Sequence, residues 1–171
     1  MRSIIIILLL AVFSSVSWPA LAVSENKAAH LFFIERSKNK NLVQYDVRLT
    51  ENRDLPDASP VRAYWVLENG GHEELDSIER RYAYGIATQE KLDKNKFRVI
   101  LVSLKGLEIL VEKINDSFKA VVSINGKQSI LERVYIESKE RLAGLPKVLY
   151  IDLFGWDKEK GFPTRERIIP K

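Results

Sequence analysis

The chain has 171 residues, 46% of them hydrophobic and 29% charged, with 8 glycines, 6 prolines and no cysteine. This composition is typical of an ordinary globular domain and excludes collagen-like and intrinsically disordered chains. The absence of cysteine excludes disulfide bonds, thiol nucleophiles and cysteine-based metal sites. Because the formal net charge is only +4 and the two signs are interspersed, we expect no nucleic-acid partner.

The N-terminus has the pattern of a secretory signal peptide. A lone Arg2 precedes the aliphatic run Ile4–Leu10, and the sequence Ala-Leu-Ala at Ala20–Ala22 is a small-x-small cleavage site. The sequence therefore predicts a cleaved signal peptide at 1–22 and a single β-rich domain at 23–171. The alternative is an uncleaved anchor, but the apolar run is shorter than the ~20 residues that span a bilayer. We expect a periplasmic or secreted protein with no stable membrane insertion. An exported protein without disulfide bonds fits a bacterial periplasm better than a eukaryotic exterior.

Alternating polar and apolar residues predict strands in the next part of the chain. His30–Arg36 is a short apolar run, and Val43–Thr50 alternates with period two, which is typical of a strand with one wet face. The polar residues 37–41 between them predict a hairpin turn. A third strand is predicted at Val61–Glu68, after the turn-rich residues 51–60.

The two faces of the third predicted strand differ in character. Trp65 shares its face with three aliphatic residues, so we expect it in the core. Tyr64 shares the opposite face with Arg62, whose charge resists burial without a partner. We therefore expect Tyr64 to face a pocket or solvent, in a functional surface that this strand forms with the segment after the helix.

One helix is predicted, from about Glu73 to Tyr84. Leu75, Ile78 and Tyr82 fall on one side of it, and its acidic residues come early and its basic residues late, which suits the helix dipole. Gly85 stands where a C-terminal cap belongs.

The rest of the chain has the pattern of a meander. Strands are predicted at Phe97–Leu104, Leu107–Ile114, Ser117–Ile124, Gln128–Ser138 and Lys147–Phe154. Asn125-Gly126 is a strong signal for a type I′ hairpin, and the apolar pair Ile168-Ile169 is expected to dock the polar tail on the domain. About eight strands and one short helix predict an all-β fold, an antiparallel β-barrel-like structure or a β-sandwich. Parallel α/β folds are excluded because crossover helices are missing.

Sequence motifs of known catalytic and cofactor sites are absent. There is no nucleophile elbow, phosphate-binding loop, dinucleotide fingerprint or zinc-protease motif. The chain has two histidines, His30 and His72, and their spacing signals neither a catalytic triad nor a zinc site. We expect no metal and no cofactor, and a hydrolase that uses His30 or His72 is the alternative function.

Segments along the whole predicted domain resemble the exported bacterial family called domain of unknown function 4833. They are HLFFIERSKNKNLVQYDVRL from His30, Pro60-Val61 with Tyr64-Trp65, Tyr84-Gly85-Ile86, and YIDLFGWDKEKGFPTRERIIP from Tyr150. The resemblance implies a compartment and domain boundaries, and it carries no activity, substrate or catalytic residue. It implies motif positions at Arg36, Asn39, Asn41, Tyr45, Tyr64, Trp65, Tyr84 and Gly85, which are candidates both for a functional surface and for folding determinants.

Aromatic and arginine residues indicate a binding surface. Aromatic rings supply contact area, and arginines orient an anionic ligand. The expected ligand-binding residues are Arg36, Asn39, Asn41, Arg62, Tyr64 and Tyr84. The favoured function is therefore a non-enzymatic exported β domain that binds a small hydrophobic or anionic molecule, or a protein partner.

Overall fold

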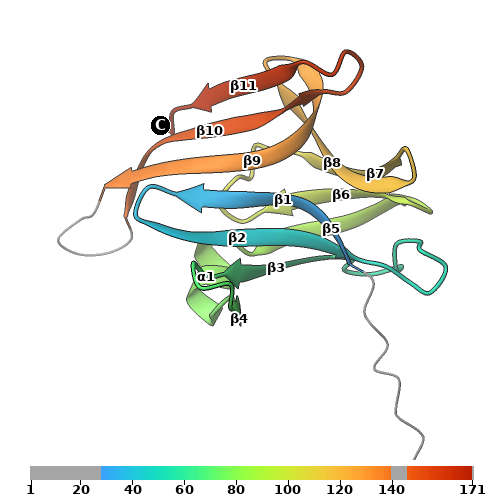
Figure 1. The fold of residues 1–171 in the computed structure, drawn as a ribbon, viewed down its shortest axis with the longest axis horizontal. Helices are drawn as coiled ribbons and strands as arrows, with labels where there is room; N and C mark the ends of the chain where they lie inside the picture. The colour runs from blue at the N-terminus through green and yellow to red at the C-terminus, as the bar shows by residue number, and fades with distance from the viewer. Residues whose placement is uncertain (1–27, 140–145, 171) are drawn as a thin grey trace, which may run out of the picture.

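The computed structural model describes residues 28–139 and 146–170, which form eleven strands and one short helix (Figure 1). The predicted signal peptide and its cleavage site lie outside the described residues. The first strands are β1 (Ala28–Arg36), β2 (Asn39–Arg48), β3 (Val61–Val66) and β4 (His72–Glu74), followed by the helix α1 (Ser77–Tyr82). The others are β5 (Ile86–Asp93), β6 (Lys96–Leu101), β7 (Ile109–Ile114), β8 (Ser117–Ile124), β9 (Lys127–Lys139), β10 (Lys147–Asp157) and β11 (Pro163–Ile168).

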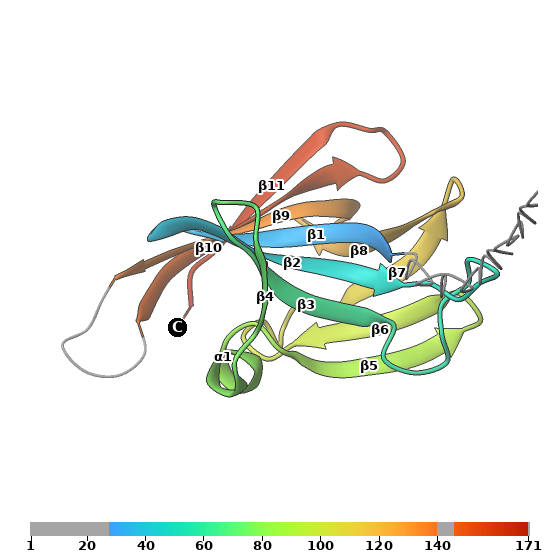
Figure 2. The same cartoon turned by 60° about the horizontal axis from the view of Figure 1, so that its bottom comes forward.

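All the strands join one strongly curled sheet (Figures 1 and 2). Its main path runs β4-β3-β2-β1-β9-β8-β7-β6-β5 and curls into a half-barrel, and the hairpin β10-β11 extends from β9. The pairs are antiparallel except β1 with β9, where Phe33–Arg36 runs parallel to Arg133–Ile136. The prediction of an all-β, barrel-like fold is confirmed. The parallel pair was not predicted, since it joins strands far apart in the sequence.

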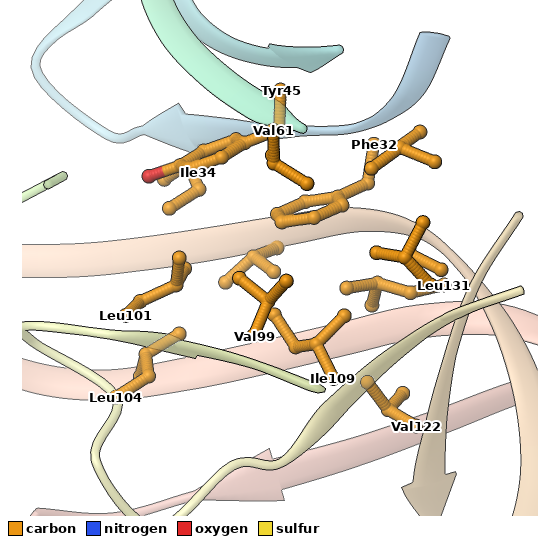
Figure 3. Packing of buried hydrophobic residues seen from close by; sticks show 14 of the residues in the cluster. Phe32, Ile34, Tyr45, Val61, Val99, Leu101, Leu104, Ile109, Val122 and Leu131 are labelled. Carbon is orange, nitrogen blue, oxygen red and sulfur yellow. The ribbon is translucent and has the colours of Figure 1, made fainter. Parts of the chain in front are cut away.

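The hydrophobic core lies on the concave face of the curled sheet (Figure 3). Phe32 and Tyr45 stack there with ring centroids 4.5 Å apart, and both side chains are almost fully buried. Burial raises the pKa of Tyr45 well above its ordinary value. Its hydroxyl donates a 2.6 Å hydrogen bond to the carbonyl oxygen of Tyr84, so the core also fixes the chain just after α1.

A glutamine side chain joins β3 to β5, which lie near opposite ends of the strand order and are brought together by the curl of the sheet. The Gln89 carboxamide accepts a hydrogen bond from Val61 N at 2.8 Å and donates one to Val61 O at 3.0 Å. One side chain thus satisfies both backbone groups of a residue on β3, as a neighbouring strand does. The Asn95 side chain makes a similar link to the loop before β3, accepting from Leu55 N at 3.1 Å.

We predict that Gln89→Met lowers the free energy of unfolding by about 2 kcal/mol. Methionine has a similar length but leaves both backbone groups of Val61 without their partner, and each such loss is worth about 1–3 kcal/mol when the group is buried. A urea titration measures the change, with Gln128→Met at an exposed hairpin position as the control. Equal stability of the two variants would contradict the bridging role of Gln89.

The helix is shorter than predicted. It spans Ser77–Tyr82 rather than about 73–84, and residues 72–74 instead form β4 beside β3. A capping box starts the helix at this point: the Asp76 carboxylate accepts from Glu79 N at 2.7 Å, and the Glu79 carboxylate accepts from Asp76 N at 3.1 Å. The acidic residues before the cap therefore belong to an edge strand, which helical spacing alone does not reveal.

Gly85 is not the helix cap that the sequence predicts, because the C-cap is Ala83. A Cβ atom at Gly85 would lie 1.7 Å from the carbonyl oxygen of Arg80. The glycine is therefore needed for the close approach of this segment to the last turn of α1.

Three strands, β4, β5 and β11, were missed by the sequence analysis because their side chains are mostly polar and exposed. The expected docking of the tail is right for Ile168, which packs against the core, but Ile169 is exposed.

The hairpin β10-β11 also holds Asp152, which is 2% exposed and accepts hydrogen bonds at 2.7–2.8 Å from Arg165 and Arg167. These arginines, Arg167 first, lower the pKa of Asp152 to about 2.

We predict that Asp152→Asn destabilises the protein by about 1 kcal/mol at pH 7 and by less at pH 2. The effect at pH 7 is modest because both arginines are partly exposed to solvent. The folded-state pKa lies below the ordinary 3.8, so the carboxylate stabilises the fold above pH 3.8. That contribution is lost as the pH falls through 2. Urea titrations of both proteins at the two pH values measure the effect, and a difference independent of pH would contradict the assignment.

Candidate functional site

The sequence-predicted site residues fall into two clusters on opposite faces of β3. Arg36, Asn39 and Tyr84 come together at one end of the barrel, beside Trp65. Arg62 and Tyr64 lie together on the outer face, with the Arg62 guanidinium 4.8 Å from the centre of the Tyr64 ring. The sixth residue, Asn41, touches the first cluster through its backbone, because its N–H donates to Asn39 Oδ1 at 3.2 Å. Its side chain points elsewhere: the Asn41 carboxamide accepts a hydrogen bond from Glu68 N and links β2 to the chain after β3.

The first cluster is built around the guanidinium of Arg36. Its central carbon lies 4.5 Å from the centre of the Trp65 ring and 5.7 Å from that of Tyr84. Its nitrogens donate hydrogen bonds to the Tyr84 hydroxyl at 3.2 Å and to Asn39 Oδ1 at 3.4 Å. The flat cation is therefore oriented by ring stacking and by two neutral acceptors.

Several elements hold this cluster in place. The β1-β2 hairpin sets Arg36 opposite Asn39. The Trp65 indole donates to Glu79 Oε2 on α1 at 2.9 Å and packs edge-on against Tyr84, with ring centroids 5.3 Å apart. Burial raises the pKa of Tyr84, and the nearby Arg36 partly offsets this rise.

A cavity of about 290 Å³ opens beside Arg36, and we call it the Arg36 pocket. Its lining is mostly apolar or neutral and comprises Arg36, Lys38, Tyr82, Ala83, Tyr84, Ser103, Ile136, Ser138, Pro146 and Val148. The lining contains two cations and no carboxylate among the residues that the structure describes. Within the same residues, no carboxylate oxygen lies at ion-pair distance from the Arg36 guanidinium. Such a pocket has the charge and the walls to hold an anion with an apolar body.

The second cluster is a hydrogen-bond network around Asp46 on the outer face. Its carboxylate is 5% exposed; one oxygen accepts from the Tyr64 hydroxyl at 2.6 Å, and the other from Gln44 Nε2 at 3.0 Å. His30 Nδ1 lies 3.2 Å from Asp46 Oδ1. Burial opposes ionisation, but the hydrogen bonds of His30, Tyr64 and Gln44 outweigh it and lower the pKa of Asp46.

The prediction that Tyr64 faces a pocket or solvent is wrong, because the side chain is 6% exposed. Its burial, and then its hydrogen bond to Asp46, raise the pKa of Tyr64 to about 12. His72 covers the ring, with centroids 5.2 Å apart. Trp65 is in the core as predicted, and it is Trp65 rather than Tyr64 that meets the segment after the helix.

Sequence reasoning missed Asp46, Gln44 and Glu79 as members of these clusters. Alternation placed Gln44 and Asp46 on the wet face of β2, and only the strand register sets them opposite Tyr64 and Arg62. Within residues 28–139 and 146–170, no group of three or more histidine, aspartate or glutamate side chains is placed to hold a metal ion. The same residues include no helix long and apolar enough to cross a membrane.

Comparison of the sequence with known families shows which part of the chain is shared with other proteins. The family model described as "Domain of unknown function (DUF4833)" matches residues 32–167. The chain belongs to this family. The matched DUF4833 region begins within β1 and ends within β11, so it includes the Arg36 pocket and the Asp46 network except His30. No curated protein and no solved structure matches the chain.

Proposed function

We propose that this DUF4833 domain is a non-enzymatic binding protein whose Arg36 pocket takes a small anionic molecule with an apolar body. The observation that carries the proposal is the half-buried Arg36 guanidinium, which lines a largely apolar cavity and whose acceptors among the described residues, Tyr84 and Asn39, are both neutral. A positive charge in such surroundings is poorly solvated, so an anion that pairs with it gains more than it would in water.

The geometry of Arg36 favours a planar or tetrahedral anionic group. The guanidinium is already oriented between Trp65, Tyr84 and Asn39, so little side-chain entropy is lost when a ligand binds. Tyr82, Ala83 and Val148 supply apolar contact area next to the charge. The proposal therefore requires both parts of the ligand, the anion and its apolar body.

We test the proposal with 8-anilinonaphthalene-1-sulfonate, an anionic aromatic dye whose fluorescence rises on binding. We expect Arg36→Gln to weaken dye binding about tenfold or more, the loss of one charge-assisted contact of about 1.5–3 kcal/mol. Arg133→Gln is the matched control, because Arg133 also stacks on a ring, that of Phe154 at 4.1 Å, but is paired with Glu35 at 2.8 Å. Equal dye affinity of the two variants would defeat the proposal.

A hydrolase that uses His30 remains the second candidate, favoured by the contact between His30 and Asp46. A serine hydrolase needs a histidine held by a carboxylate and a hydroxyl next to it. Among the described residues no serine or threonine hydroxyl hydrogen-bonds to either histidine, and the hydroxyl in the Asp46 network is that of Tyr64, which donates to Asp46 rather than to His30. We expect His30→Gln to leave the rate of p-nitrophenyl acetate hydrolysis unchanged, and a loss of that rate would support the hydrolase.

We propose in addition that the protein is exported and that residues 1–22 are removed. The small-residue pair Ala20 and Ala22 after the apolar run is the basis for this proposal. Intact-mass analysis of protein recovered from the producing cell should give a chain that begins at Val23. Retention of residues 1–22 would contradict it.

A further inference from the structure

A second and larger cavity adjoins the Arg36 pocket. It has a volume of about 470 Å³ and lies between the β6-β7 connection and the hairpin β10-β11. Its lining comprises Ser103, Leu104, Lys105, Gly106, Leu107, Glu108, Ser123, Ile151, Leu153, Glu166, Ile168 and Pro170. Ser103 lines both cavities, so they meet at this residue.

The floor of the two cavities is formed by apolar side chains of the core. Ile136 lines the Arg36 pocket, and its partner across the β9-β10 ladder is Ile151, which lines the second cavity. Leu153 and Ile168 continue this surface away from Arg36, on paired strands β10 and β11. We call the second cavity with this floor the alkyl groove.

The charges along these cavities are uneven. The Arg36 guanidinium lies at one end, in the Arg36 pocket. The two carboxylates that line the alkyl groove already have partners: Glu108 pairs with Arg98 at 3.1 Å, and Glu166 accepts from Asn125 N at 2.5 Å. Lys105 also lines the groove, but it is exposed on the β6-β7 connection. The oriented, half-buried guanidinium of Arg36 is therefore the site that we assign to an anionic group.

We propose that the Arg36 pocket and the alkyl groove together bind a monomeric single-chain amphiphile, with its anionic head at Arg36 and its alkyl chain along Ser103 into the groove. This inference rests on the proposed function and names its ligand class. An alkyl chain makes no hydrogen bonds, so it fits a floor of isoleucine and leucine without leaving polar groups unsatisfied. A carboxylate or sulfate head fits the two-pronged guanidinium of Arg36.

The first test measures the dependence of affinity on chain length. Butyrate, octanoate and laurate, each below its micelle concentration, are titrated into the full-length protein by calorimetry. Each pair of buried methylenes should raise the affinity roughly tenfold. If laurate bound no more tightly than octanoate, the proposed alkyl groove would be wrong. Arg36-dependent binding of the dye would be unaffected by that result. Failure of the groove can therefore be told apart from failure of the proposed function.

The second test uses variants and a changed head group. Ser103→Trp fills the junction of the two cavities from an exposed position, so it should weaken laurate tenfold or more and leave butyrate unchanged. Leu92→Trp, at an exposed position on β5 outside both linings, is the control. Dodecyltrimethylammonium has the same chain length with a cationic head, and we expect it to bind at least tenfold more weakly than laurate. Equal binding of both amphiphiles, or equal laurate affinity of the two variants, would overturn the proposal.

Discussion

Trp65→Ala should lower the free energy of unfolding by about 3–5 kcal/mol, the usual cost of removing a buried aromatic ring. Trp65 is 6% exposed, belongs to the core cluster and packs edge-on against Tyr84. Its removal also leaves Arg36 without the ring on which it stacks and frees Glu79 of α1. A urea titration followed by circular dichroism measures the change.

Trp156→Ala is the matched control for this substitution. Trp156 also donates its indole N–H to a carboxylate, Glu132 Oε2 at 3.0 Å, but its side chain is 44% exposed. We expect a cost below about 1 kcal/mol, since little packing is lost at an exposed position. If the two substitutions had the same effect, Trp65 would not hold the position in the core that we assign to it.

Tyr64→Ala should also destabilise the protein, by about 3 kcal/mol. The pattern of β3 led us to expect an exposed or pocket-facing tyrosine, whose truncation would leave the fold largely intact. The structure instead buries the ring beneath His72 and Arg62 and ties its hydroxyl to the buried carboxylate of Asp46. Truncation therefore removes packing and a charge-assisted hydrogen bond together.

Tyr64→Phe separates these two contributions, because it keeps the ring and removes the hydroxyl. We expect a cost of about 1.5–3 kcal/mol, the value of a hydrogen bond to a charged group. The free energies of unfolding of both variants are measured in urea at pH 7. If Tyr64→Ala were as stable as the unchanged protein, the Asp46 network would contribute nothing to the fold.

The features that the sequence predicted well depend on local signals. The strand β8 has the predicted bounds, and the turns on either side of it use residues that tolerate positive φ. Asn115 and Asp116 have φ of 48° and 62°, and Asn125 and Gly126 have φ of 49° and 76°. Such turns are encoded by two adjacent residues, so no knowledge of the rest of the fold is needed.

The features that the sequence did not predict depend on contacts between distant segments. The polar residues of β5 gave no strand signal, yet Gln89 on that strand satisfies the backbone of Val61. Likewise, Tyr64 and Asp46 are 18 positions apart, and their burial on the outer face depends on the register of β2 and β3. Alternation distinguishes the two faces of a strand but does not say which face is covered.

In the candidate site, too, the sequence predicted the residue types but not their spatial grouping. Arginine and aromatic content singled out Arg36, Asn39 and Tyr84, which the structure brings together. The same reasoning included Arg62 and Tyr64, which lie on the other face of the sheet. Residue types thus identified the chemistry of the Arg36 pocket, but the grouping required the curl of the sheet and the position of α1 (Figure 2).

Binding of an anion at Arg36 is the central claim, and a nuclear magnetic resonance titration of ¹⁵N-labelled protein with 8-anilinonaphthalene-1-sulfonate tests it most directly. The Trp65 ring lies under the Arg36 guanidinium, so its indole N–H reports on binding there, whereas Trp156 is exposed and offers a hydrophobic dye a second place to bind. The sequence has three tryptophans, Trp18, Trp65 and Trp156, so Trp65→Phe and Trp156→Phe are each used to identify the signal of the residue replaced. We predict a saturable shift of the Trp65 signal that is lost in Arg36→Gln, with the Trp156 signal unchanged. A shift of the Trp156 signal while that of Trp65 stays in place would contradict the claim.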